Sequence, residues 1–179
     1  MELKGSKTEA NLMAAFAGES QARNKYTFYA EKAKQDGYEQ IGNLFLETAE
    51  NERAHARLWF ERLQGGALKS TPENLDAAAE GERYEWVTMY AEFAETAKEE
   101  GFNDIAALFE LVGKIESEHE RRFVKLQENI RGGKVFSGTE NSVWICLNCG
   151  FIYTGKQPPA KCPVCSKPQA YFQLKVEAY

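Results

Sequence analysis

Apolar residues recur every three or four positions through most of the first 131 residues, which is the spacing of helices that bury one face. Glycine interrupts this pattern four times, and glycine commonly follows a helix C-terminus. The pattern predicts four long helices, at about residues 8–36, 38–64, 72–100 and 102–130. Thr71 is expected to cap the third helix and Pro72 to occupy its first turn.

The pattern changes after Gly133, where short β-prone runs alternate with turn residues. These runs cover residues 143–145, 151–153 and 171–174. The sequence therefore predicts a mainly α domain at 1–133 and a small β-rich domain at 134–179.

The helical part contains an internal repeat, in which residues 18–64 and 81–128 look like two copies of one helical hairpin. An offset of 64 relates Tyr26 to Tyr90, Gly37 to Gly101, Glu52 to Glu116 and His55 to His119. Glu19 instead matches Glu82 at an offset of 63, so the second copy carries one extra residue between Glu82 and Tyr90. A single insertion within a helix often forms a π-bulge, which we expect here.

Charge divides along the same boundary. The chain has a net charge of −5, of which residues 134–179 hold +3 and residues 1–133 the remaining −8. An acidic helical part argues against nucleic-acid binding, which needs clustered Lys and Arg. No apolar run is long enough for a membrane span or an export signal, so we expect no membrane partner and a cytoplasmic location.

The two histidines of the chain each follow a glutamate by three residues, in Glu52-x-x-His55 and Glu116-x-x-His119. At this spacing both side chains share one helical face and can bind one metal ion. A hydrogen-bonded core histidine is the simpler interpretation of either pair alone. Further glutamates on inward-facing stripes, at Glu19, Glu82 and Glu85, complete the ligand pattern of ferritin-like dimetal bundles. Buried carboxylates need cations, so we expect two metal ions there.

All four cysteines lie within twenty positions of the second domain. They form two C-x-x-C pairs separated by twelve residues, which predicts a tetrahedral thiolate site for zinc or iron. The ligands would be Cys146, Cys149, Cys162 and Cys165.

The motifs together resemble the rubrerythrin family over essentially the whole chain. They are the segment from Ala17 to Arg23, Glu52-Arg53-Ala54-His55, Glu82-Arg83-Tyr84-Glu85-Trp86, Glu116-Ser117-Glu118-His119 and the two cysteine pairs. The resemblance implies a ferritin-like four-helix bundle that holds two non-haem irons, followed by a rubredoxin-like domain with one iron bound by four cysteines. One departure is Ser166, which follows Cys165 where rubredoxins usually have glycine.

The resemblance also implies roles for single residues. Glu52 and Glu116 would bridge the irons, Glu19 and Glu85 would bind one iron, and Glu82 and His119 the other. His55 would alternate with Glu85, and Tyr26 and Tyr90 would lie behind the ligands.

The implied function is a peroxidase that reduces hydrogen peroxide to water in oxidative-stress defence. Its electrons would come from rubredoxin or an NAD(P)H-dependent reductase and pass through the four-cysteine iron. Two alternatives remain open: a ferroxidase or iron-handling protein that uses oxygen, and a zinc-ribbon scaffold without catalysis.

The link between the second and third helices predicts a homo-oligomer. In a ferritin-like bundle these helices run parallel, so their link must climb about 27 Å and cross about 8–10 Å. The steps from Leu63 to Pro72 span at most about 30–32 Å when fully extended. Since a link that contains Gly65 and Gly66 and is stretched to this limit would be strained, we expect two chains to exchange hairpins in a helix-swapped dimer. The alternatives are an up-down-up-down bundle and an unswapped protomer with its link stretched along the surface.

Overall fold

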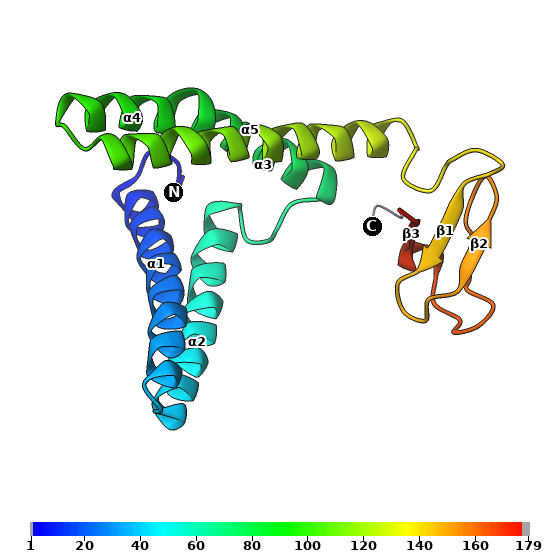
Figure 1. Ribbon diagram of the computed structural model, residues 1–179, viewed down its shortest axis with the longest axis horizontal. Coiled ribbons are helices and arrows are strands. Elements are labelled where there is room, and N and C mark those ends of the chain that lie inside the picture. Colours follow the sequence, from blue (N-terminus) through cyan, green and yellow to red (C-terminus); the bar gives the residue numbers. More distant parts are fainter. Residues whose placement is uncertain (1, 177–179) are drawn as a thin grey trace. The chain divides into compact units, whose positions relative to one another are not determined.

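The computed structural model describes residues 2–176, and the chain forms two compact units, residues 1–69 and 70–179. The first unit is a helical hairpin of α1 (Lys7–Gln35) and α2 (Glu39–Leu63). The second begins with a longer hairpin and ends in a small sheet (Figure 1). Its helices are α3 (Thr71–Tyr84), η1 (Glu85–Met89), α4 (Tyr90–Glu99) and α5 (Asn103–Arg131). The mainly α prediction is therefore confirmed, with helix ends within two residues of those expected.

The helices end where glycine permits a left-handed backbone. Gly37, Gly65, Gly101 and Gly133 all have positive φ, between 63° and 88°. The predicted cap of the third helix was wrong by one residue, because Ser70 rather than Thr71 is the N-cap of α3. The Glu73 carboxylate accepts hydrogen bonds from the Ser70 backbone N–H at 3.0 Å and from its hydroxyl at 2.5 Å. This reciprocal capping box favours Ser70.

The repeat is visible in the packing of both hairpins. Small residues at matching positions are buried between the helices: Ala30 and Ala94, Ala33 and Ala97, Gly42 and Ala106. The aromatic rings repeat as well, since Tyr26–Phe45 and Tyr90–Phe109 both have centroids 6.0 Å apart. Two copies of one hairpin geometry follow from two copies of one sequence pattern.

The extra residue of the second copy forms a π-helical turn. This turn, η1, runs from Glu85 to Met89 and joins α3 to α4 without a break in the helical backbone. The expected π-bulge is confirmed. A π turn is rare and often lies at a functional site, because its extra residue shifts the side chains around it.

The small sheet contains β1 (Val143–Cys146), β2 (Ile152–Thr154) and β3 (Phe172–Leu174), and η2 (Gln169–Tyr171) precedes β3. The strand order is β2-β1-β3, with both pairs antiparallel. Trp144, Cys146, Cys162 and Phe172 are buried together as its core. The Trp144 indole N–H donates to the Gly155 carbonyl at 2.8 Å, which satisfies its only polar group.

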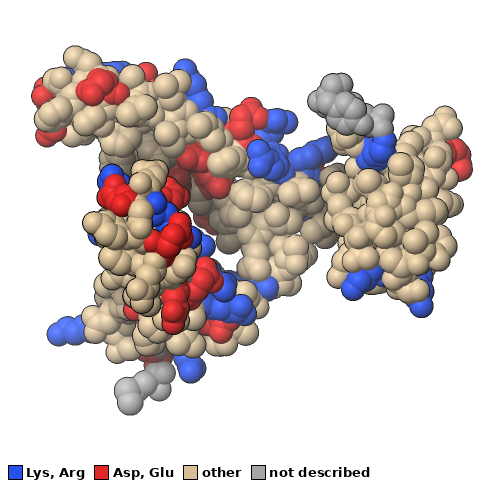
Figure 2. All heavy atoms as spheres, turned by 60° about the horizontal axis from the view of Figure 1, so that its bottom comes forward, with Lys and Arg blue, Asp and Glu red and all other residues tan. Residues whose placement is uncertain are grey.

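Charged side chains are distributed unevenly over the surface. On the face drawn in Figure 2, acidic and basic side chains intermingle over the helices, whereas the sheet module shows few charges, mostly lysines. Within residues 2–176, none of the helices combines the length and apolar character that crossing a bilayer requires.

The turns after the two cysteine pairs generate a stability prediction. Gly150 has φ 76° and Ser166 has φ 60°, so both turns need a left-handed residue, and a Cβ at Gly150 would meet no atom within 4 Å. Gly150→Ala should therefore destabilise the module through backbone strain alone, by about 1 kcal/mol. Thermal unfolding of the metal-loaded chain, followed by metal–thiolate absorption, measures this. Ser166→Gly is the matched change and should leave stability equal or higher; a loss from this variant would contradict the strain argument.

Candidate metal centres

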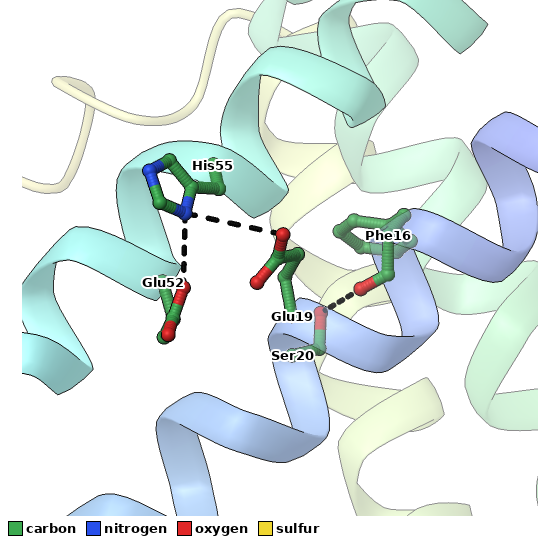
Figure 3. A network of polar contacts seen from close by, with 5 residues as sticks. All are labelled: Phe16, Glu19, Ser20, Glu52 and His55. Carbon is green, nitrogen blue, oxygen red and sulfur yellow. Dashed lines mark hydrogen bonds and ion pairs between the residues drawn. The ribbon is translucent and has the colours of Figure 1, made fainter.

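The first hairpin brings together Glu19 from α1 with Glu52 and His55 from α2. The His55 Nδ1 lies 2.9 Å from a Glu52 carboxylate oxygen and 3.9 Å from one of Glu19 (Figure 3). One ligand atom from each of the three residues lies within 4.8 Å of the others, a spacing that one metal ion can span. Ser20 does not compete for this group, because its hydroxyl donates to the Phe16 carbonyl at 2.7 Å.

The second hairpin repeats the arrangement with Glu82 from α3 and with Glu116 and His119 from α5. The His119 Nδ1 lies 2.6 Å from Glu116 and 3.7 Å from Glu82. Helical spacing explains the Glu-x-x-His contact in both hairpins, because residues three apart share a face. The internal repeat explains why, in both hairpins, the remaining glutamate comes from the helix that precedes the Glu-x-x-His pair.

Burial and charge repulsion both act within the second group. Burial raises the pKa of Glu82 most and the Glu116 carboxylate raises it further, His119 lowers it by less than Glu116 raises it, and Glu85 adds a smaller increase. Burial also raises the pKa of Tyr90, as do the charges of Glu85, Glu116 and Glu82. Several carboxylates therefore crowd one partly buried place, where a cation would relieve their repulsion. The donor set of carboxylates and imidazole fits iron.

Glu85 stands slightly apart from these groups. It is the first residue of η1, and it is not among the three residues whose ligand atoms gather within 4.8 Å. Its charge nevertheless acts on both Glu82 and Tyr90. Tyr90 is thus next to the second group, whereas Tyr26 is placed by its ring contacts with Phe45 and Tyr29.

The four cysteines form a separate group. The Cys146 sulfur lies 3.7 Å from the Cys165 sulfur, and the Cys149 sulfur lies 3.7 Å from that of Cys162. Both distances are far longer than the S–S bond of a disulfide. Four sulfurs around one metal at about 2.3 Å would be separated by about 3.8 Å, so the spacing fits a tetrahedral site. All four thiols are free of disulfides.

Backbone N–H groups support the thiolates. The N–H of Lys167 is the main cause that lowers the pKa of Cys165, to about 6. The N–H of Phe151 acts in the same direction on Cys149, but burial and the other thiols outweigh it and raise that pKa to about 12. Ser166 keeps the turn that presents the Lys167 N–H by adopting the left-handed conformation that glycine would take.

One polar network beside the second group was not predicted from the sequence. Trp86 donates its indole N–H to Glu120 at 2.6 Å, and Arg83 lies 3.6 Å from the other oxygen of that carboxylate. The internal repeat could have pointed to Glu120, because the corresponding residue of the first copy, 64 positions earlier, is Ala56. Glu120 therefore replaces an alanine close to the ligands, which indicates a role that only the second copy has.

Comparison with known proteins agrees with the geometry. The rubrerythrin family model matches residues 10–127, and the model of the rubrerythrin rubredoxin-like domain matches residues 144–173. Rubrerythrin of Porphyromonas gingivalis is 52% identical, covering 96% of this chain and 91% of its own length. Rubrerythrin-1 of Clostridium acetobutylicum is 50% identical over 99% and 98% of the two chains. Rubrerythrin of Nitratidesulfovibrio vulgaris is 44% identical over 96% of each.

The cofactors follow from these matches and from the donor groups. They are a non-haem di-iron centre at the carboxylate and histidine residues and one iron bound by four cysteines. The ferritin-like class and the rubredoxin-like module expected from the sequence are likewise confirmed.

The crowding at Glu82 generates a prediction for the metal-free protein. Its pKa is higher in the folded than in the unfolded state, so the ionised carboxylate destabilises the fold at neutral pH, and this cost disappears as the pH falls below the usual glutamate pKa of about 4.3. Glu82→Gln should therefore raise the melting temperature of metal-free protein at pH 7, by a margin that shrinks towards pH 4. With iron bound the sign should reverse, because the variant loses a ligand. Glu80→Gln changes an exposed residue of the same helix and is the control. An equal rise in melting temperature for Glu80→Gln would contradict the assignment of the destabilisation to Glu82.

Proposed function

Because the chain belongs to the rubrerythrin family, we propose that it is a non-haem di-iron peroxidase that reduces hydrogen peroxide to water. The observation that carries the proposal is the pair of repeat-related groups, each with two carboxylates and one histidine. The irons, when bound, supply the two electrons that peroxide reduction consumes. The family is one of oxidoreductases, and peroxide as substrate is our more specific assignment.

In this proposal each ligand has one task. Glu52 and Glu116 would hold both irons, Glu19 and Glu85 would hold one, and Glu82 and His119 the other. His55 would take the place of Glu85 in the reduced protein, which would exchange a charged ligand for a neutral one and keep the charge of the buried site nearly constant. The crowding of Glu85, Glu82 and Glu116 supports such an exchange, since it favours the departure of one carboxylate after the irons lose positive charge.

The four-cysteine iron would act as a one-electron relay from a rubredoxin or an NAD(P)H-dependent reductase to the di-iron site. The family-model matches leave residues 128–143 between the two modules, and we propose the domain boundary within this stretch, at residue 133. Four thiolates and a ferric iron would lower the +3 of residues 134–179 to about +2, which still favours docking on the acidic helical part.

Turnover tests the peroxidase assignment. An NADH-driven assay, coupled through a suitable reductase, should consume peroxide much faster than oxygen. Comparable rates with oxygen would favour ferroxidase activity instead. A protein that binds zinc at all sites and shows no turnover would favour a scaffold.

A variant of Glu85 gives the most specific test in this assay. Glu85→Ala should keep the fold and most of the iron, because Glu82, Glu116 and His119 remain, but peroxide turnover should fall by about 10-fold or more. Glu95→Ala, which removes an acid from α4 and no proposed ligand, is the matched control. Unchanged turnover in Glu85→Ala would overturn the role of Glu85.

We also propose that two chains exchange hairpins. The link between α2 and α3 runs from Leu63 to Thr71, and eight steps reach at most about 26–29 Å. A parallel arrangement of these helices within one bundle would need about 30 Å. Gly65 and Gly66 also curl into the turn that ends α2, where the Gly66 N–H bonds the Glu61 carbonyl at 2.7 Å, and this shortens the reach further.

Burial indicates that each hairpin needs a second hairpin against it. Each hairpin buries only small residues along its internal contact, and large apolar side chains remain exposed. Leu44 and Leu58 of the first hairpin are 56% and 54% exposed, and Leu108 and Leu111 of the second are 61% and 55% exposed. Such faces need a second hairpin to cover them.

Mixed chains test the exchange. When Glu52→Ala chains and Glu116→Ala chains are refolded together, a swapped dimer of one of each has one intact and one doubly damaged site. Random mixing should restore roughly a quarter of wild-type activity. Each variant refolded alone is the control and should stay inactive. Mixtures as inactive as the single variants would show that each site comes from one chain.

A further inference from the structure

The π turn η1 is tied to α5 by a single carboxylate. Glu120 accepts the Trp86 indole N–H on one oxygen at 2.6 Å, and its other oxygen lies 3.6 Å from the Arg83 guanidinium. The Glu120 side chain is only 17% exposed, whereas the Arg83 side chain is 66% exposed, so the acceptor is largely covered although its two partners reach the surface. We call these three residues the Glu120 clamp.

The clamp surrounds the residue that the proposed chemistry moves. Arg83 and Trp86 flank Glu85 in the sequence, and Glu120 directly follows His119. One carboxylate therefore connects the segment that carries Glu85 to the turn of α5 that carries His119.

The first hairpin lacks every part of the clamp. Ala56 stands in the place of Glu120, and at the offset of 63 Ser20 and Arg23 correspond to Arg83 and Trp86. The Arg23 Nε is buried without a hydrogen-bond partner among the described residues. The clamp thus occurs only in the copy that contains the π turn and Glu85.

Packing alone does not fix the Trp86 ring. One side of it lines a groove of about 620 Å³, together with Tyr90, Phe109 and Gly113. A ring with open space beside it can change rotamer unless a directional bond holds it. The hydrogen bond to a charged acceptor supplies that restraint.

We propose that Glu120, with Arg83 and Trp86, is a positioning residue that holds η1 in place and so determines where the Glu85 carboxylate lies at the metal site. The clamp keeps the backbone of the π turn still while the Glu85 side chain changes its position. This inference rests on the proposed role of Glu85, whereas the rigidity of η1 can be measured independently of turnover.

Hydrogen exchange of the full-length, iron-loaded protein tests the rigidity. Trp86→Phe and Glu120→Ala should each speed exchange of the η1 amides by about tenfold or more, because a hydrogen bond to a charged group is lost. Trp59→Phe is the matched control: it makes the same chemical change on α2, where the indole N–H is buried and has no partner among the described residues. Glu120→Gln should rescue much of the protection, since its amide oxygen still accepts from Trp86. Unchanged η1 exchange in Trp86→Phe would overturn the clamp.

The reduction potential of the di-iron site tests the link to Glu85. Trp86→Phe should shift this potential in the wild-type background and leave it unchanged in a Glu85→Ala background, because the clamp acts through Glu85. A shift of equal size in both backgrounds would overturn the positioning role. Faster η1 exchange and a Glu85-dependent shift in a protein that does not reduce peroxide would support the clamp and refute the peroxidase assignment, so the two failures are distinguishable.

Discussion

Repulsion between carboxylates is the constraint on which the helical part of this chain depends. Each hairpin places two glutamates and a histidine within reach of one ion, and burial raises the pKa of Glu82 in the second. Such a group is costly without a cation and favourable with one. Bound metals are therefore expected to stabilise the fold, and in the proposed mechanism the same repulsion would favour the release of one carboxylate.

Small residues at the helix contacts make this arrangement possible. Ala30, Ala33 and their repeat counterparts Ala94 and Ala97 let the paired helices approach closely, so that ligands from neighbouring helices meet. Because only small residues are fully buried between the paired helices, large apolar side chains stay exposed on each hairpin. A hairpin of this kind needs another hairpin packed on it, so hairpin pairing and metal binding depend on each other.

The two copies of the repeat have diverged where function would require it. The ligand distances are nearly the same, at 2.9 and 3.9 Å in one hairpin and 2.6 and 3.7 Å in the other. The second copy alone gained a residue, the acid Glu85 and the Trp86–Glu120 bond. In the proposed ligand exchange the first half would supply His55, and the second would supply Glu85 and the Trp86–Glu120 bond beside it.

The sequence by itself determined the four helical segments, the two Glu-x-x-His pairs, the cysteine site and the π turn, because each depends on spacing along one helix or one turn. Only the tertiary structure decided features that join distant residues or choose between local alternatives. Ser70 rather than Thr71 caps α3 because the Glu73 side chain reaches back to it. Ser166 adopts φ 60° because the turn imposes a left-handed backbone on whatever residue stands there. Trp86 meets Glu120 across 34 residues because η1 and α5 pack side by side, a contact that no periodicity within one helix encodes.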